Sequence, residues 1–137
     1  MLLAHMPQLV GRLVAASREG IVFQVHNSGP TPAYNVEVTL FFGTTMQPRS
    51  DALRLSHPLG PGDMTDEVIR LPIGYEAWSA DKTFESQVRY NDAVGNRFMA
   101  RLWHYRDWDE ATPQSSMYRI RNDGTLENLT TNVSLSP

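Results

Sequence analysis

The chain contains no cysteine and only one lysine, Lys82, beside eleven arginines. The lack of thiols excludes a disulfide framework, a zinc–thiolate site, an iron–sulfur cluster and a cysteine nucleophile. No apolar run approaches the ~20 residues of a membrane-spanning helix, so we expect a membrane to be reached only through a segment outside this chain. The formal net charge is −3. Because a nucleic-acid module normally carries a basic face, we expect no nucleic-acid partner.

What the chain does have is alternation of apolar and polar residues. At 137 residues it has the length of one domain. In Ile21–Val25 and in Val36–Phe42 every second residue is apolar, and most of these are β-branched or aromatic. This pattern predicts two strands with one buried face each. The segment between them, Asn27–Pro32, contains two prolines and Gly29, which permits positive φ, and it therefore predicts a loop.

Further short runs of this kind are separated by turn-forming residues. We expect strands within Gln8–Ala16, Ala52–Ser56, Thr65–Leu71, Thr83–Asn91 and Asn96–Tyr105. For Gln8–Ala16 a short helix is the alternative, which Gly11 disfavours. Short strands with turn signals every ~8–12 residues are typical of a β-sandwich rather than of a βαβ fold. The strand within Ala52–Ser56 is short, which is typical of an edge strand.

The sequence therefore predicts an all-β protein, an antiparallel, immunoglobulin-like β-sandwich of about seven strands. We expect the sandwich over residues 8–105, a disordered N-terminal stump over residues 1–7 and a C-terminal extension over residues 106–137. Within the extension, Asn122–Gly124 predicts a small hairpin, because Asp-Gly is a recognised two-residue turn. The last residues, from 130 onward, are expected to be frayed.

Three motifs resemble a known family of bacterial domains. Val25–Val38 (VHNSGPTPAYNVEV) resembles the V-x-N-x-G-x-x-x-A-x-N-V-x-V signature of immunoglobulin-like domains of the CARDB, or cell-adhesion-related, type. Leu59–Asp63 looks like their L-x-P-G turn, and Val88–Phe98 looks like the closing V-x-Y-x-D-x-x-G-x-x-F hairpin. The motif residues are structural: an asparagine that caps a turn, a glycine at positive φ and an alanine small enough for a tight corner. The resemblance implies an immunoglobulin-like sandwich in a bacterial surface, secreted or membrane-anchored protein without catalysis.

A group of aromatic residues on one strand face is the feature most typical of binding. If Phe98 and Leu102 face the core, the residues between and after them face outwards, and Phe41 points the same way. An exposed group of aromatic, methionine and arginine side chains is typical of a protein-binding surface. The predicted binding residues are Phe41, Met99, Arg101, Trp103, Tyr105 and Trp108. A second interpretation is that residues 106–137 fold back over this face, with Trp108 and Met117 packing against it.

Patterns for catalysis and metal binding are weak. The sequence contains no H-x-H or H-x-x-x-H pair, no G-x-S-x-G elbow, no Walker A loop and no dinucleotide fingerprint. The acidic run Asp107–Glu110 lacks the spacing of an EF-hand, which favours a solvated loop, and Asp92 is expected to cap its own turn. The remaining catalytic hypothesis is a cofactor-free site built from His26, His104 and Asp92 where strand ends share a rim.

These features favour a non-catalytic interaction or spacer module of a bacterial envelope-associated protein, with no cofactor and no metal. The expected partner is another protein or a second copy, bound through an aromatic sheet face or an edge. The alternative is a small-ligand or carbohydrate-binding module in which Trp103, Tyr105 and Trp108 form a stacking platform.

Overall fold

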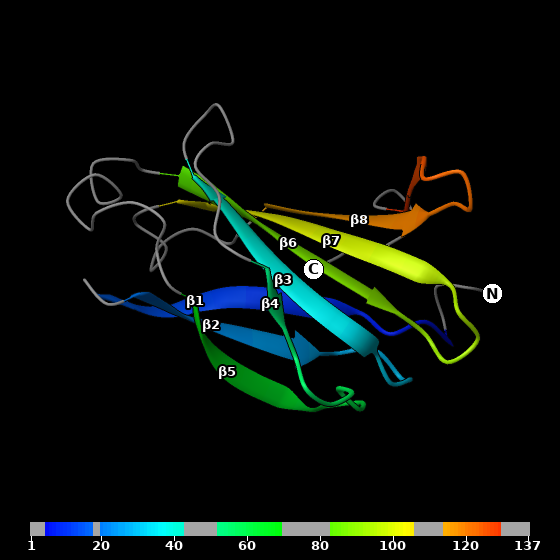
Figure 1. Cartoon of the computed structure of the whole chain (residues 1–137), viewed down its shortest axis with the longest axis horizontal. Helices are drawn as coiled ribbons and strands as arrows, with labels where there is room; N and C mark the ends of the chain where they lie inside the picture. Colours follow the sequence, from blue (N-terminus) through cyan, green and yellow to red (C-terminus); the bar gives the residue numbers. More distant parts are fainter. Residues whose placement is uncertain (1–4, 18–19, 43–51, 70–82, 106–113, 130–137) are drawn as a thin grey trace.

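Two antiparallel β-sheets lie face to face in the computed structural model, which describes residues 5–17, 20–42, 52–69, 83–105 and 114–129 (Figure 1). The smaller sheet has the strand order β1-β2-β5, and the larger sheet has the order β4-β3-β6-β7-β8-β9. The predicted all-β antiparallel sandwich is therefore confirmed. Within the described ranges, no helix is long and apolar enough to cross a membrane.

The strands of the described residues number nine rather than about seven. Their bounds are β1 (Leu9–Ser17), β2 (Gly20–Asn27), β3 (Tyr34–Phe42), β4 (Leu53–Arg54), β5 (Met64–Ile69), β6 (Thr83–Asn91), β7 (Arg97–Tyr105), β8 (Gln114–Ile120) and β9 (Leu126–Asn128). The first seven are the expected strands. Their order is 1-2-5 in one sheet and 4-3-6-7 in the other. The two-residue β4 lies at the edge of its sheet, as predicted.

The additional strands β8 and β9 come from the expected C-terminal extension. β8 pairs with β7 from Gln114 to Ile120, and β9 pairs with β8. The predicted hairpin is present, with Gly124 at a φ of 86° in its turn, and Leu129 is buried in the core. The sandwich thus extends to Leu129, past the expected boundary at residue 105. The reason is that β8 forms backbone hydrogen bonds with the edge of β7, which would otherwise be unpaired. The predicted frayed tail, from residue 130, lies outside the described residues.

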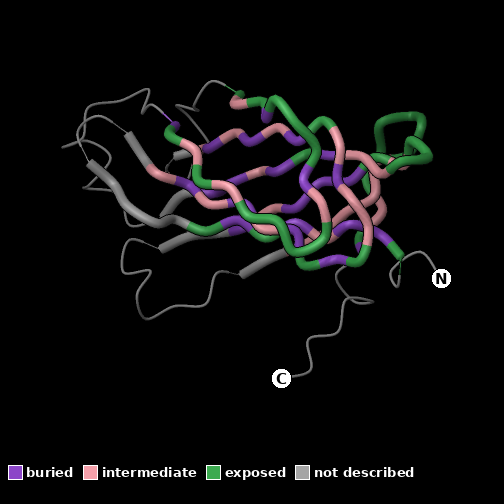
Figure 2. Tube along the Cα trace, turned by 90° about the horizontal axis from the view of Figure 1, so that it is seen from below, coloured by how far each residue is buried: buried purple, intermediate pink, exposed green. Residues whose placement is uncertain are grey.

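The core consists of alternate residues from the facing strands, and Figure 2 shows this alternation of buried and partly exposed positions along the chain. The two strands singled out in the sequence supply its centre: all of their expected core positions that are described are fully buried, namely Phe23, Val25, Val36, Val38 and Leu40. From the β6–β7 hairpin come Val88, Tyr90, Phe98, Ala100 and Leu102. At these core positions the period-two pattern predicted correctly which side chains leave water.

The segment before β1 also belongs to the core. Met6 is 1% exposed, although residues 1–7 were expected to be a disordered stump, of which residues 1–4 lie outside the described part. A Cβ atom added to Gly29 would lie 2.6 Å from both the carbonyl oxygen of Met6 and the backbone nitrogen of Gln8. Gly29 does not have the expected positive φ, which occurs instead at Asn35 (53°) and Gly62 (80°). Glycine is thus required at position 29 for the close approach of two backbone segments.

Tyr90 attaches the larger sheet to this N-terminal segment. Its hydroxyl donates a hydrogen bond of 3.1 Å to the carbonyl oxygen of Pro7, and its ring stacks on Phe98 with the ring centroids 5.6 Å apart. Burial raises the pKa of the Tyr90 phenol above its ordinary value, because the charged phenolate would lose its hydration.

We expect this phenol to make the free energy of unfolding depend on alkaline pH. A tyrosine whose pKa is higher in the folded chain contributes its full stabilisation below its unfolded pKa of about 10. Above that pH, the free energy of unfolding falls by about 1.4 kcal/mol for each pH unit until the folded pKa is reached. Tyr90→Phe should remove this dependence and lower stability at pH 7 by about 1 kcal/mol, the value of one hydrogen bond. Urea unfolding of both proteins between pH 8 and 11 measures it. Parallel curves would contradict the assignment.

Candidate functional site

Three of the predicted binding residues, Phe41, Met99 and Arg101, lie on the face of the larger sheet that points away from the core, called here the outer face of the larger sheet. Strand register aligns Phe41, Glu85 and Trp103 in one row across β3, β6 and β7. Met99 and Arg101 lie two residues apart on β7 and share one face, because side chains alternate along a strand. The register agrees with the predicted grouping of Phe41, Met99 and Arg101.

Exposure on this face differs from the expectation. Met99 is 3% exposed, so its prediction as part of an exposed patch is wrong, and Phe41 and Arg101 are half-buried. Met99 lies between Arg89 and Tyr118 in register, and long neighbouring side chains on both strands restrict its contact with water. The side chains of Trp103 and Tyr105, and all of Trp108, lie outside the described part of the structure.

The second interpretation of this face, in which residues 106–137 cover it, is wrong at Met117. This residue pairs with Ala100 on β7 and packs against the core instead. The predicted acidic loop, Asp107–Glu110, lies outside the described residues. The predicted carbohydrate platform consists of the side chains of Trp103, Tyr105 and Trp108, which lie outside the described part of the structure.

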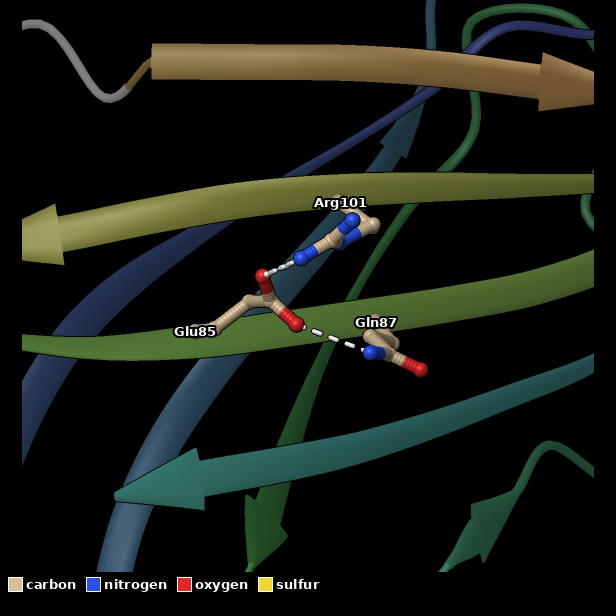
Figure 3. Close-up of polar contacts among 3 residues, drawn as sticks. All are labelled: Glu85, Gln87 and Arg101. Atoms are coloured by element: carbon tan, nitrogen blue, oxygen red, sulfur yellow. Dashed lines mark hydrogen bonds and ion pairs between the residues drawn. The ribbon is translucent and has the colours of Figure 1, made fainter. Parts of the chain in front are cut away.

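A closed polar cluster occupies the outer face of the larger sheet (Figure 3). Arg101 donates two hydrogen bonds to Oε1 of Glu85, from Nε at 3.0 Å and from Nη2 at 2.7 Å. Gln87 donates to the other carboxylate oxygen, Oε2, at 2.8 Å. The Glu85 side chain is completely buried, whereas that of Arg101 is 32% exposed. The guanidinium carbon of Arg101 also lies 5.9 Å from the ring centroid of Tyr118, within cation–π range.

This cluster is suited to holding strands together rather than to chemistry. The hydrogen bonds to Glu85 raise the pKa of Arg101 above its already high ordinary value, so the guanidinium stays charged. Both oxygens of Glu85 already accept hydrogen bonds, so the carboxylate is not presented to a substrate. The sequence reasoning missed Glu85, although a signal existed. A hairpin turn at residues 92–95 fixes the register, and that register makes Glu85 and Arg101 diagonal neighbours.

The catalytic hypothesis required His26 and His104 to lie close together, and the two residues are far apart. His26 is the last residue but one of β2, whose end lies beside the N-terminal segment. The Tyr90 hydroxyl near the end of β6 contacts the same segment. His26 therefore lies at the end of the sandwich where the β6–β7 turn is found. His104 lies seven residues along β7 from its start at Arg97, which corresponds to about 23 Å at ~3.3 Å per residue. The two histidines thus occupy opposite ends of the sandwich, and they do not share a rim.

Asp92, the third member of that group, caps its turn as predicted. Its Oδ1 accepts hydrogen bonds from the backbone amides of Val94 and Asn96, at 3.1 and 2.8 Å. Its Oδ2 accepts a hydrogen bond of 2.8 Å from the Asn96 side chain. Across the described ranges, no group of three or more histidine, aspartate or glutamate side chains could hold a metal ion.

The outer face of the smaller sheet carries three of the five large apolar residues that are exposed in the described part of the chain. Register places Val10, His26 and Met64 in one row across β1, β2 and β5, and it places Val68 beside Val22 in another. Val10, Met64 and Val68 are 47%, 55% and 63% exposed. Exposed apolar side chains on adjacent strands form a patch, which is more informative than the same residues scattered singly.

One edge of this sheet is formed by β5. Among the described strands, β5 pairs with β2 on one side only, so its other edge carries unpaired backbone groups. Two adjacent carboxylates, Asp66 and Glu67, lie at its centre. Oδ1 of Asp66 accepts a hydrogen bond of 2.9 Å from the Gln24 side chain. Glu67 lies on the same side of the strand as the buried Ile69 and is itself half-buried.

The fold and the surfaces define a class of protein, an all-β antiparallel sandwich whose two outer faces differ in character. Comparison of the chain with protein-family models, with curated proteins and with solved structures found no match. The functional argument therefore rests on the geometry of these surfaces.

Proposed function

We propose that the chain is a non-catalytic interaction module that binds an extended segment of a protein partner along β5. The observation that carries the proposal is an edge strand that combines exposed Met64 and Val68 with the carboxylates of Asp66 and Glu67. An unpaired strand edge is a template for a further strand, in which main-chain hydrogen bonds give affinity and alternate side chains give specificity. The binding surface proposed here replaces the aromatic face, where Met99 and Glu85 are buried.

Charge selects the kind of partner. In a symmetric antiparallel pair of two β5 strands centred on Asp66 or on Glu67, that carboxylate would lie opposite its own copy, and like charges in that position destabilise a pair. A half-buried charge such as Glu67 on an edge strand also discourages pairing with uncharged strands. A segment whose basic residues lie opposite Glu67 would place its apolar residues on the face of Met64 and Val68, because side chains alternate along a strand. The pair with Glu67 would contribute about 0.2–1 kcal/mol. The proposed partner is therefore an extended segment with alternating apolar and basic residues.

A fluorescently labelled, end-blocked heptapeptide of alternating valine and lysine tests this proposal. We expect saturable binding that weakens with salt, and no binding of the matching valine–glutamate peptide. Val68→Lys should weaken binding about tenfold, which corresponds to ~1.4 kcal/mol. The control is Val94→Lys, the same substitution at a valine that is 84% exposed in the β6–β7 turn. Equal losses in the two variants, or equal binding of the two peptides, would overturn the proposal.

The same charges should keep copies of the chain from pairing through β5. We expect Asp66→Thr combined with Glu67→Thr to raise the weight-average mass in light scattering as protein concentration increases, because the free edge then carries no like charges. The parent chain should show a smaller increase over the same concentrations. An unchanged mass for the double variant would mean that this edge does not accept a further strand.

Two parts of the proposal rest on other observations. The separation of His26 and His104 supports the absence of catalysis, because it removes the group that the sequence offered for it. Location in a bacterial envelope, and kinship with CARDB-type domains, rest on the resemblance of the loop and hairpin motifs alone.

A further inference from the structure

A hollow at one end of the larger sheet gathers positive charge in a chain whose net charge is negative. It has a volume of about 280 Å³ and lies among the β6–β7 turn, the start of β7 and the β8–β9 hairpin. Three of its lining residues are arginines, Arg97, Arg119 and Arg121, and one is a carboxylate, Glu127. Strand register places Arg97 and Arg119 on opposite faces of the sheet, so a group in the hollow would be reached from both sides of the sheet end.

None of these three arginines forms an ion pair with a carboxylate of the described residues, whose two ion pairs involve Arg54 and Arg101. Each makes a single neutral contact: Arg97 donates to the carbonyl oxygen of Arg121, Arg119 to Asn96 and Arg121 to Thr125. A guanidinium carries five N–H donors in a planar fork. Most of the donors of this group are therefore left for water or for a ligand.

Two nearby carboxylates offset only part of this positive charge: Glu127 lines the hollow, and the hydrogen bonds from Thr125, followed by the charge of Arg121, lower the pKa of Asp123. Oδ1 of Asp123 accepts hydrogen bonds from both the backbone amide and the hydroxyl of Thr125, at 2.9 and 2.6 Å. Glu127 pairs with Arg119 in register, yet no ion pair joins the two side chains. A second hollow of about 160 Å³ shares Arg97 and is lined by both Arg89 and Glu37, so its charges are mixed.

We propose that this hollow is a binding site for a tetrahedral oxyanion, a phosphate or sulfate group. The planar forks of arginine match the oxygens of such a group and can each donate two parallel hydrogen bonds. The volume lies just below the ~300–1,000 Å³ of sites that enclose a whole small molecule, so the hollow fits one anionic group. That group is either a free ion or part of a larger molecule whose remainder lies outside. The site lies on the larger sheet and is separate from the binding edge proposed for β5.

The full chain is titrated with inorganic phosphate at constant ionic strength, and binding is followed by NMR shifts of the backbone amides of Gly95 and Asn96. We expect saturable shifts confined to the hollow. Arg97→Gln, Arg119→Gln and Arg121→Gln should each weaken binding about tenfold through the loss of charge-assisted hydrogen bonds. Glu127→Gln should strengthen it, because this change removes the only carboxylate among the residues that line the hollow.

The control is Arg12→Gln, which removes the same charge from an exposed position on β1 in the other sheet. It should leave the phosphate affinity within about twofold, since charges further apart than the ~8–10 Å Debye length are largely screened. A parallel titration with O-phosphoserine distinguishes the sources: tighter binding than that of phosphate assigns the site to an esterified group, and weaker binding assigns it to the free ion. Shifts that do not saturate, or an equal loss in Arg12→Gln, would refute the site.

Discussion

Replacing Asn27 by aspartate is expected to lower the free energy of unfolding by about 4 kcal/mol at pH 7, a large part of the ~5–15 kcal/mol of a typical domain. The Asn27 side chain is completely buried. Its Nδ2 donates hydrogen bonds of 2.9 Å to the carbonyl oxygens of Thr31 and Leu59. Its Oδ1 accepts from the backbone amides of Gly29, at 3.0 Å, and Gln8, at 3.3 Å. Aspartate would place a charged oxygen against two carbonyl oxygens and would remove both donors.

The contacts of Asn27 explain why one change should have this effect. They join four separate segments: the residues before β1, the loop after β2, the turn before β5 and β2 itself. Its backbone takes part as well, because its amide donates to the carbonyl oxygen of Asp63 and its carbonyl accepts from the amide of Gly62. Loss of the Nδ2 donor removes a hydrogen bond from the carbonyl oxygens of Thr31 and Leu59, of which only Leu59 keeps another within the described part of the chain, from the Ala33 amide. A buried group left unsatisfied costs about 1–3 kcal/mol.

Urea unfolding at pH 7 and pH 4 measures the effect of Asn27→Asp. An unpaired buried carboxyl has a raised pKa, so the deficit should be smaller at pH 4, where protonation neutralises the new side chain, and should grow as pH rises. The control is Asn122→Asp at an exposed turn position, which should change stability by less than about 0.5 kcal/mol. Similar losses in the two variants would show that Asn27 does not hold these segments together.

The second large effect is expected at Arg101. Arg101→Met should lower stability by about 3–5 kcal/mol, because it leaves the completely buried carboxylate of Glu85 without its cation. Removal of that charge in the double variant Glu85→Gln, Arg101→Met should recover much of the loss, since the destabilising group is the unpaired carboxylate. Thermal and urea unfolding of the single and double variants measure both values.

The chain provides a matched control for burial. Arg54 and Glu37 form an ion pair with the same N–O distance of 2.7 Å, but their side chains are 74% and 27% exposed. Arg54→Met should therefore change stability by less than about 1 kcal/mol, the usual range of a surface ion pair. If the two Arg→Met changes had equal effects, burial of Glu85 would not be the source of the stabilisation.

The sequence predicted the strands and their buried faces well, because both depend on residues two positions apart. Phe23, Val38 and Phe98 could be placed in the core from alternation alone, since side chains of a strand point in turn to opposite faces. The turn at Asp92 and the hairpin at residues 122–124 were equally local, because Asp and Gly favour turns wherever they occur.

Predictions that required distant neighbours did less well. Exposure of Met99 was wrong because its burial depends on which strands flank β7, and β8 had been expected to lie in a separate extension. The glycine at position 29 had been explained by a positive φ. The structure shows instead that the backbone of residues 6–8 approaches too closely to leave room for a side chain there. The shared rim of His26 and His104 was wrong for the same reason, since alternation says nothing of which strand ends meet.

By itself, then, the amino-acid sequence determined that this chain folds into strands, which side of each strand leaves water, and where the chain turns. The tertiary structure alone decided which strands became neighbours: it brought Arg101 to Glu85, Asn27 to Leu59, and three arginines to one end of the larger sheet. The physical reason is range. Side-chain alternation and turn preference act over a few residues, whereas the order of strands in a sheet is settled by hydrogen bonding and packing between segments far apart in the chain.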